Sequence, residues 1–174
     1  MRKIITILLL VTAALIALLL FPLELAGSTR IAFTTEIKRA LEDVFDYVTT
    51  PANWPRWHPS SLGVSGATDH PLNVGEKVIE DFSVAGRKGR AIWTVTDKDR
   101  PKHWVIDGKV EGGGEGVITY TLTPLPEGTQ FERVFVYKRP NLLFAALDAL
   151  SLREQIEAES VEALRRLKFE LEKR

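Results

Sequence analysis

The sequence predicts an α+β fold in which a curved antiparallel sheet of about seven strands wraps around a long C-terminal helix, preceded by an N-terminal transmembrane helix. Three observations predict this fold class. An uncharged run opens the chain, alternating apolar residues separated by turn formers fill its middle, and a helical pattern continues from Pro140 to the end. Only this last helix is long enough to cover one face of the sheet. A strongly curved sheet around a single helix leaves space for a ligand, so we expect an internal cavity.

Residues 1–27 form the predicted membrane anchor. Residues 4–23 contain no charged side chain, and a helix of that length spans about 30 Å, the thickness of the hydrocarbon layer of a bilayer. Arg2 and Lys3 precede the run and favour a cytoplasmic N-terminus. The chain is therefore expected to cross the membrane once, with its soluble domain on the non-cytoplasmic side.

A cleaved signal peptide is the alternative interpretation of the same segment. Signal peptides usually have an apolar core of about 7–15 residues and small residues before the cleavage site. Glu24 is unfavourable for cleavage after Ala26. A retained helix is the favoured interpretation, and residues 28–174 form the predicted ligand-binding domain.

The charge of the chain is balanced, with 23 basic and 23 acidic side chains in 174 residues. Proteins that bind nucleic acids usually carry an excess of positive charge, so a nucleic-acid partner is not expected. The absence of cysteine excludes disulfides, zinc–thiolate sites, iron–sulfur clusters and thiol nucleophiles. The histidines His58, His70 and His103 lack the spacing of metal ligands, so we expect neither a metal site nor a cofactor.

The soluble domain begins with a strand, an amphipathic helix and a short helix. Residues 30–38 alternate between apolar and polar side chains, which predicts a half-buried strand. Residues 40–48 place their apolar side chains on one helical stripe. Residues 51–59 contain three prolines, so they can form only a short helix or a turn.

The middle of the chain reads as six strands separated by glycine-, proline- and aspartate-rich breaks. The predicted strands cover residues 62–67, 75–85, 89–98, 102–111, 115–123 and 129–139. Connections this short make neighbouring strands antiparallel. The glycine-rich run at residues 112–116 is a predicted hairpin turn rather than a phosphate-binding loop, because no helix follows it and the Lys-Ser/Thr pair is missing.

The C-terminal helix is predicted over residues 141–173. Its second half is amphipathic, whereas its first part, up to residue 152, is apolar on nearly every side. A helix with so much apolar surface is expected to be buried along much of its length. The side chains predicted to be buried are Leu147, Leu150, Ile156, Leu164 and Leu167.

Three segments of the soluble domain resemble a known superfamily. They are IAFTTEIKRALEDVFDYVTTPANWPRWHPS, GGGEGVITYTLTPLPEGTQFERVFVY and EAESVEALRRLKFELEKR. Together they resemble the SRPBCC superfamily, with its START-like helix-grip fold, and within it the polyketide cyclase/dehydrase-like branch. The resemblance covers residues 29–172 and implies a hydrophobic cavity for a lipid, quinone, polyketide or similar ligand. Members of this family range from carriers to enzymes, so the fold does not decide between these functions.

Strand alternation predicts which side chains line the cavity. In the strand at 102–111, Trp104 and Ile106 share an uncharged face, while His103 shares the opposite face with charged side chains. The uncharged face is expected to point inward and His103 to point toward solvent. The same reasoning, together with the apolar start of the C-terminal helix, gives the predicted ligand-binding residues. These are Trp93, Trp104, Ile106, Tyr120, Phe135, Phe144 and Leu147.

Glu80, Tyr120 and Arg133 are the polar side chains that could carry a reaction in the cavity. Glu80 shares a largely apolar strand face, so if this face lines the cavity the carboxyl group is buried and its pKa is raised. The competing and favoured interpretation turns that face outward near an edge, with Ile79 inward. An inward Arg133 would either pair with Glu80 or bind a carboxylate of the ligand.

The WPRWHP segment at residues 54–59 also has two interpretations. Trp54, Trp57 and His58 could form a gate at the cavity mouth, with His58 as an acid or base. The favoured interpretation is structural: the tryptophans pack the short helix against the sheet, and His58 lies near the surface.

These observations predict a membrane-tethered domain that binds a hydrophobic small molecule or lipid without catalysis. One alternative is an enzyme of the polyketide cyclase or dehydratase type, which needs convergent polar groups inside the cavity. Another is a protein-interaction module that uses the exposed face of the sheet. The membrane is the expected partner of the N-terminal helix, and the sequence leaves the ligand and the oligomeric state open.

Overall fold

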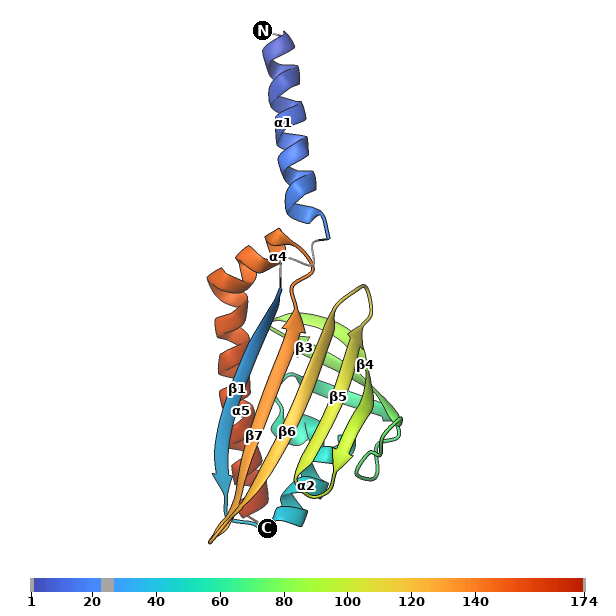
Figure 1. Cartoon of the computed structure of the whole chain (residues 1–174), viewed down its shortest axis with the longest axis vertical. Helices are drawn as coiled ribbons and strands as arrows, with labels where there is room; N and C mark the ends of the chain where they lie inside the picture. Colours follow the sequence, from blue (N-terminus) through green and yellow to red (C-terminus); the bar gives the residue numbers. More distant parts are fainter. Residues whose placement is uncertain (1, 23–26, 174) are drawn as a thin grey trace.

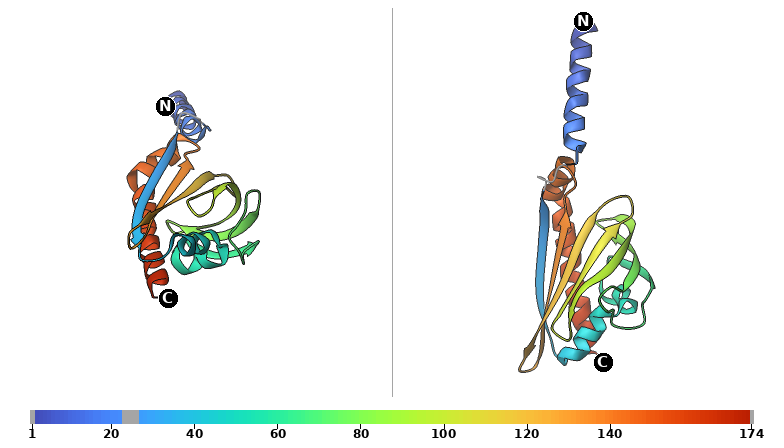
Figure 2. Two further views of the ribbon diagram at one scale, coloured as in Figure 1. Left: turned by 60° about the horizontal axis from the view of Figure 1, so that its bottom comes forward. Right: turned by 45° about the vertical axis from the view of Figure 1, so that its right-hand side comes forward.

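The computed structural model describes residues 2–22 and 27–173. Its body is a seven-stranded antiparallel sheet in the order β1-β7-β6-β5-β4-β3-β2, which curls around the C-terminal helix α5 (Figures 1 and 2). The strands are β1 (Ser28–Ile37), β2 (Ser61–Gly66), β3 (Lys77–Val84), β4 (Arg87–Asp99), β5 (His103–Val110), β6 (Glu115–Leu125) and β7 (Gly128–Lys138). The α+β helix-grip fold predicted from the sequence is therefore confirmed.

The first and last strands of the domain are neighbours in the sheet. β1 pairs with β7 over its full length, from Ser28 opposite Lys138 to Ile37 opposite Thr129. From β2 to β7, neighbouring strands also follow each other along the chain, joined by the loop at residues 67–76 between β2 and β3 and by short turns between the other strands. The sheet is therefore a meander from β2 to β7, completed by β1 at its far edge.

Short helices close one end of the concave face. They are α2 (Leu41–Thr49), the 3₁₀ turn η2 (Pro51–Asn53) and α3 (Trp54–Trp57). Within the apolar stripe of α2, Val44, Phe45 and Val48 are buried and Leu41 is half-buried, as its spacing predicts. Trp54 and Trp57 are also buried, and the indole N–H of Trp54 donates to the carbonyl of Val48 at 2.9 Å. The tryptophans thus pack α3 into the core, as the structural interpretation of this segment expects.

The predicted C-terminal helix consists of three consecutive segments. α4 (Leu142–Leu147) leads into a π-helical segment, η3 (Asp148–Leu152), and then into α5 (Arg153–Glu172), which packs against β1 and α3. Ile156, Leu164 and Leu167 are buried, as predicted. The prediction for Leu147 and Leu150 is wrong, because these side chains are 51% and 79% exposed.

The physical reason for this correction is the orientation of η3. Asp148 is the buried side chain of this segment, at 3% exposure, and it accepts hydrogen bonds from the hydroxyl groups of Thr29 and Tyr137. A helix that turns Asp148 toward the sheet must turn the positions next to it away. Apolarity alone therefore gave the wrong face of the helix.

The N-terminal helix α1 (Arg2–Leu20) extends away from the sheet, beside α4 (Figure 1). The span from Lys3 to Leu20 has a mean hydropathy of 2.7, and none of it is buried. By length and composition this helix could cross a membrane, and a signal sequence would meet the same criteria. The expected helix boundary at Leu23 and the cleavage site at Ala26 lie outside the described residues.

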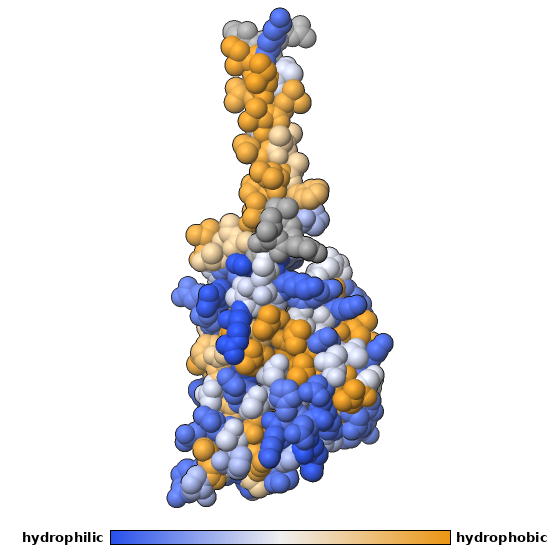
Figure 3. Space-filling model, in the orientation of Figure 1, coloured by the Kyte–Doolittle hydropathy of each residue, from blue (hydrophilic) through white to orange (hydrophobic). Residues whose placement is uncertain are grey.

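The interior contains one main apolar cluster and one smaller cluster. The main cluster joins the sheet to α2, α3 and the C-terminal half of α5, and the smaller one contains Ile31, Tyr137 and Ile156. The outer face of the sheet is mainly polar with an apolar patch in its middle (Figure 3). Val117, Val134 and Val136 point to this outer face and are half-buried.

Candidate functional site

Five polar side chains from five separate parts of the chain point into the interior of the domain. We call them the interior polar cluster: His58 after α3, Ser61 on β2, Glu80 on β3, Tyr120 on β6 and Arg133 on β7. Local structure sets the inward direction of these side chains. Side chains on a strand alternate between the two faces of the sheet, so the neighbours of each strand residue point outward, and His58 lies at the C-terminal end of the short helix α3. Buried polar groups are uncommon unless they are paired or functional, so this cluster is the candidate site.

Glu80 lies on the inner face of the sheet. Its Oε2 accepts a 2.7 Å hydrogen bond from the indole N–H of Trp93, and Ile79 is exposed on the other face. The interpretation favoured from the sequence, with Ile79 inward, is therefore wrong. Burial raises the pKa of the Glu80 carboxyl group, while Ser61, Trp93 and then Arg133 act against this shift.

The indole of Trp93 reaches Glu80 by lying flat over the neighbouring strand. A Cβ atom at Gly108 would lie 2.3 Å from the six-membered ring of Trp93, so any larger residue at that position would collide with it. Gly108 stands opposite Trp93 in the β4–β5 ladder. The glycine thus provides the space that lets the tryptophan turn its N–H group toward the carboxylate.

Arg133 is the cationic member of the cluster and is only 6% exposed. Its Nε–H has no hydrogen-bond partner among the described residues, and its guanidinium group lies 5.5 Å from the centre of the Phe135 ring. A buried guanidinium donor without an acceptor is costly. This unpaired donor is the feature of the interior that most directly indicates a ligand acceptor, whether a carboxylate, a carbonyl or a hydroxyl oxygen.

Tyr120 stands directly opposite Arg133 in the β6–β7 ladder. Burial raises the pKa of its phenol to about 12, although Arg133 acts in the opposite direction. Its ring stacks on Trp104, with centroids 5.2 Å apart, and meets Phe131 edge-on at 5.0 Å. The phenol is therefore a neutral hydrogen-bonding group at the border between the polar cluster and an aromatic wall.

The structure places His58 in the interior, which corrects the expectation that it lies near the surface. Its Nε2 is buried without a hydrogen-bond partner among the described residues, while the backbone N–H of Ser60 donates to Nδ1 at 3.3 Å. Burial, together with Arg133 and Arg166, holds the pKa of His58 well below its ordinary value. His58 is thus a neutral imidazole at neutral pH.

The inward position of His58 could not be predicted, because the proline-rich segment has no periodicity from which a face could be assigned. Glu80 and Arg133 were both candidates, but their proximity depends on the curl of the sheet. β3 and β7 are separated by three strands, yet the Glu80 carboxyl group interacts with Arg133 across the concave face. Sheet curvature is a property of the whole domain and cannot be obtained from one strand.

The apolar side chains predicted to line the cavity occupy three environments. Trp93, Trp104, Ile106 and Tyr120 are buried in the main cluster, whereas Phe135 and Phe144 are partly buried and belong to or adjoin the smaller cluster. The inward phase assigned to Trp104 and Ile106 is correct, and His103 is on the outside near Asp97. Leu147 lies on the exterior and does not line the interior. The role of the other six in ligand binding stays a prediction.

Glu159 on α5 holds two covering segments over the interior. Its carboxylate accepts a 2.6 Å hydrogen bond from the Ser60 hydroxyl and a 2.8 Å bond from the backbone N–H of Ala85. Ala85 lies in the β3–β4 turn with a φ of 47°, an unfavourable angle for a residue other than glycine. One carboxylate thus connects the central helix to this turn and to the loop that carries His58.

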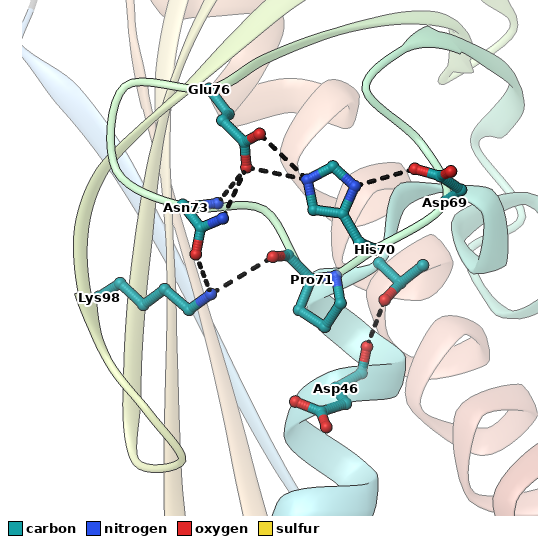
Figure 4. Close-up of polar contacts among 8 residues, drawn as sticks. Asp46, Asp69, His70, Pro71, Asn73, Glu76 and Lys98 are labelled. Carbon is teal, nitrogen blue, oxygen red and sulfur yellow. Dashed lines mark hydrogen bonds and ion pairs between the residues drawn. The ribbon is translucent and has the colours of Figure 1, made fainter.

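A second polar cluster lies in the loop before β3 and is largely exposed (Figure 4). The imidazole of His70 bridges Asp69 and Glu76 at 2.8 and 3.0 Å, and these carboxylates raise its pKa. Glu76 also accepts from the backbone N–H of Asn73, and Lys98 donates to the Asn73 side chain. These contacts fix the loop against β4, so we interpret this cluster as structural.

Two further features bear on the location of a site. Within residues 2–22 and 27–173, no three His, Asp or Glu side chains are grouped as metal ligands. An open surface depression of about 390 Å³ lies at the β6–β7 turn, lined in part by Leu125, Glu127 and Lys168. None of the interior polar cluster lines this depression.

The comparisons with known proteins agree with the fold. The sequence model of the family described as "Polyketide cyclase / dehydrase and lipid transport" matches residues 28–172. None of the curated proteins compared with the chain matches it significantly.

Several solved structures share the architecture. A conserved protein from Geobacillus kaustophilus has a TM-score of 0.65 at 19% identity, covering 83% of this chain and 96% of its own. Major latex-like protein 151 from Panax ginseng has a TM-score of 0.63 at 15% identity, and the match covers 83% of this chain and 97% of the ginseng chain. A protein from Rhodobacter sphaeroides has a TM-score of 0.63 at 23% identity, and the match covers 82% of this chain and 91% of the Rhodobacter chain. At these identities the similarity shows the fold alone.

Proposed function

Because the chain belongs to the polyketide cyclase, dehydrase and lipid transport family, we propose that its domain binds a hydrophobic small molecule or lipid between α5 and the sheet, without chemically changing it. We further propose that α1 is retained as a single transmembrane helix and tethers the domain on the non-cytoplasmic side. The observation that carries the binding proposal is the buried Nε–H donor of Arg133, which has no hydrogen-bond partner among the described residues and lies in the interior polar cluster beside the aromatic ring of Phe135.

The arrangement fits an amphiphilic ligand. The aromatic wall of Trp104 and Tyr120 and the side chain of Ile106 offer an apolar surface, and Arg133 offers a donor at its border. A few directed polar groups in a largely apolar pocket are typical of small-molecule sites. The ligand would therefore place its apolar body against the aromatic wall and an oxygen atom at Arg133.

Access to this region requires movement of the segments that cover it. The bonds from Glu159 to Ser60 and Ala85 are the polar contacts that hold the loop after α3 and the β3–β4 turn against α5. Their opening would expose the interior without unfolding the sheet. Local opening of this kind costs less than global unfolding.

The protonation states of Tyr120 and His58 favour binding over acid–base catalysis by these two groups. A general acid or base works best with a pKa near the working pH. Burial moves the pKa of Tyr120 up to about 12, and burial with two arginines moves the pKa of His58 well below its ordinary value. Neither group is suited to exchange a proton near pH 7.

Glu80 is the observation that favours the second candidate function, an enzyme of the cyclase or dehydratase type. Its carboxyl group has a raised pKa and lies inside the domain near Arg133. A carboxylate of this kind could remove a proton from a bound ligand while the guanidinium group stabilises the resulting oxyanion. This candidate predicts that the bound molecule is converted, and that Glu80→Gln stops conversion but not binding.

Native mass spectrometry of the full chain, extracted from membranes in detergent, tests the proposal. We expect a non-covalent adduct with the mass of a lipid or other hydrophobic molecule, lost on collisional activation. The Ile106→Trp variant should carry less adduct, and the exposed variant His103→Ala should carry as much as the wild type. If the wild-type chain carries no adduct and takes up no added fatty acid or quinone, the binding proposal is wrong.

A further inference from the structure

The segment made of α4 and η3 presents an apolar face to the outside. Leu143, Leu147 and Leu150 are spaced four and three residues apart, so they lie on one side of the helix. Their exposed fractions are 39%, 51% and 79%. We call these three residues the leucine face. Three large aliphatic side chains exposed together on one helix indicate a surface that is covered in the functional state.

The orientation of this face is fixed by the opposite side of the same helix. Phe144 and Leu152 pack against the smaller apolar cluster, and Asp148 between them bonds to Thr29 and Tyr137. Rotation of the helix to bury the leucines would turn Asp148 outward and break its hydrogen bonds with both hydroxyl groups. The leucine face is therefore held outward by a buried carboxylate.

The position of the leucine face identifies its partner. α4 contacts α1, and the apolar surface of α1 continues into the apolar shoulder of the domain beside it (Figure 3). If α1 crosses a bilayer, α4 lies at the level where that bilayer begins. A second membrane contact of this kind needs no new partner, because the helix next to it already places the surface in contact with lipid.

The charges around the face agree with a lipid surface. Among residues 141–152 Asp148 is the one charged side chain, and it is buried. Arg139 and Arg153 flank the segment at its two ends and Arg30 is exposed on the neighbouring β1, while Glu154 is the exposed acidic residue next to Arg153. An apolar helix face with arginines at its ends is typical of helices that lie in the interface between lipid tails and headgroups.

We propose that the leucine face inserts into the interfacial layer of the bilayer that α1 crosses, so that the domain is held against the membrane by a second contact. This inference rests on the proposed role of α1 as a membrane tether. Docking would fix the smaller apolar cluster, which lies directly beneath α4, next to the lipid phase. A lipid ligand would then leave the bilayer beside the domain that binds it.

Site-specific labelling of the full chain tests this proposal, because the sequence contains no cysteine. Single cysteines are introduced by Leu147→Cys, Leu150→Cys, Leu9→Cys in α1 and, as the matched control, Val161→Cys on the exposed side of α5. Each variant is labelled with a polarity-sensitive fluorophore and reconstituted into vesicles of phosphatidylcholine and phosphatidylglycerol. Quenching by nitroxide-labelled lipids then reports contact with the bilayer.

We expect severalfold stronger quenching at positions 147 and 150 than at 161, and strong quenching at position 9. If position 9 is quenched while 147 and 150 behave like 161, the docking proposal is overturned and the tether stands. If position 9 is not quenched, the tether and the docking proposal both fail. The labels at positions 147 and 150 could instead be shielded from an aqueous quencher without being quenched by the labelled lipids. A second copy of the chain would then cover the leucine face, and this result would also overturn the proposal.

Discussion

The indole N–H of Trp93 donates a 2.7 Å hydrogen bond to the carboxylate of Glu80, which is buried on the inner face of the sheet. This bond favours the ionised form of a carboxyl group whose pKa is raised by burial. Ser61 and Arg133 lower the pKa of Glu80 in the same direction. The protonation of Glu80 therefore depends in part on the tryptophan.

Trp93→Phe is expected to raise the pKa of Glu80 further, because it removes a donor that stabilises the carboxylate. Leaving a buried acceptor without its partner should also lower the free energy of unfolding by about 1–3 kcal/mol. Carbon-13 NMR titration of the Glu80 carboxyl group measures the pKa. Trp54→Phe is the control, since its indole bonds to the carbonyl of Val48 instead. An unchanged pKa in Trp93→Phe would contradict the assigned role.

His58 should make the domain less stable in acid. The folded protein holds the pKa of His58 below its value in the unfolded chain, so between these two values the unfolded chain binds the extra proton. The free energy of unfolding should therefore fall as the pH decreases from about 6.5 toward the folded pKa, and tenfold weaker proton binding corresponds to about 1.4 kcal/mol.

Urea unfolding at several pH values checks this expectation. In His58→Gln the free energy of unfolding should fall less between pH 6.5 and 5 than in the wild type. The exposed control His103→Gln should show the same fall as the wild type. His70, whose pKa is raised, contributes stability below about pH 6.5 that is lost at higher pH. His70 is present in every variant, so its contribution to the free energy of unfolding cancels in the comparison. Identical pH profiles for wild type and His58→Gln would show that this imidazole is not buried as described.

Leucines along the C-terminal helix should separate into two classes. Leu164→Ala and Leu167→Ala remove buried side chains, and each should lower the free energy of unfolding by about 2–5 kcal/mol. Leu147→Ala and Leu150→Ala remove exposed side chains and should cost less than about 0.5 kcal/mol in detergent solution. Chemical denaturation of the four variants gives the values. Equal losses in both classes would contradict the assigned helix orientation.

Ligand occupancy should depend on the inward face of β5. Ile106→Trp places a larger ring among Trp104, Tyr120 and the other aromatic side chains of the interior, so it should weaken binding of a hydrophobic ligand at least tenfold. His103→Ala on the opposite face should leave the affinity unchanged. Titration of the full chain with a fluorescent fatty acid measures both. The reverse pattern would mean that the ligand binds on the outer face of the sheet.

Retention of α1 predicts a mature chain that begins at its first residues. Intact mass measurement and N-terminal sequencing of the protein purified from membranes are expected to find residues 4–23 still present. The physical reason is the long uncharged run and the acidic residue near the cleavage position. A mature chain that starts at Gly27 or later would establish a cleaved signal peptide instead.

The parts of the fold that could be predicted from the sequence are those set by local periodicity. Alternation placed Trp104 and Ile106 inward because the opposite face of their strand carries charges, which sheet formation does not bury. On β3 both faces have apolar members, so the same reasoning favoured the wrong face for Glu80. Tertiary pairing, through Trp93 and the curvature of the sheet, decides its orientation.

The errors at His58 and Leu147 have different causes. His58 lies in a segment without periodicity, and its burial results from the packing of α3 against the helix and sheet. Leu147 belongs to an apolar run that resembles a core helix, but the single charged residue in that run, Asp148, is the one turned inward. A lone aspartate in such a run is a signal that could have been noticed. The pairing of Asp148 with Tyr137 and Thr29 depends on tertiary structure.

The pairing of β1 with β7 sets the order in which the domain can form during synthesis. β1 leaves the ribosome first, but its partner positions lie more than half the chain later, where Ser28 meets Lys138. Until β7 emerges, β1 has no neighbour in the sheet, because β2 lies at the opposite edge. If α1 has already entered the membrane, β1 remains unpaired beside the bilayer until synthesis of the meander from β2 to β7 is complete. Closure of the sheet is then a late, long-range step, and slow folding is typical of such non-local contacts.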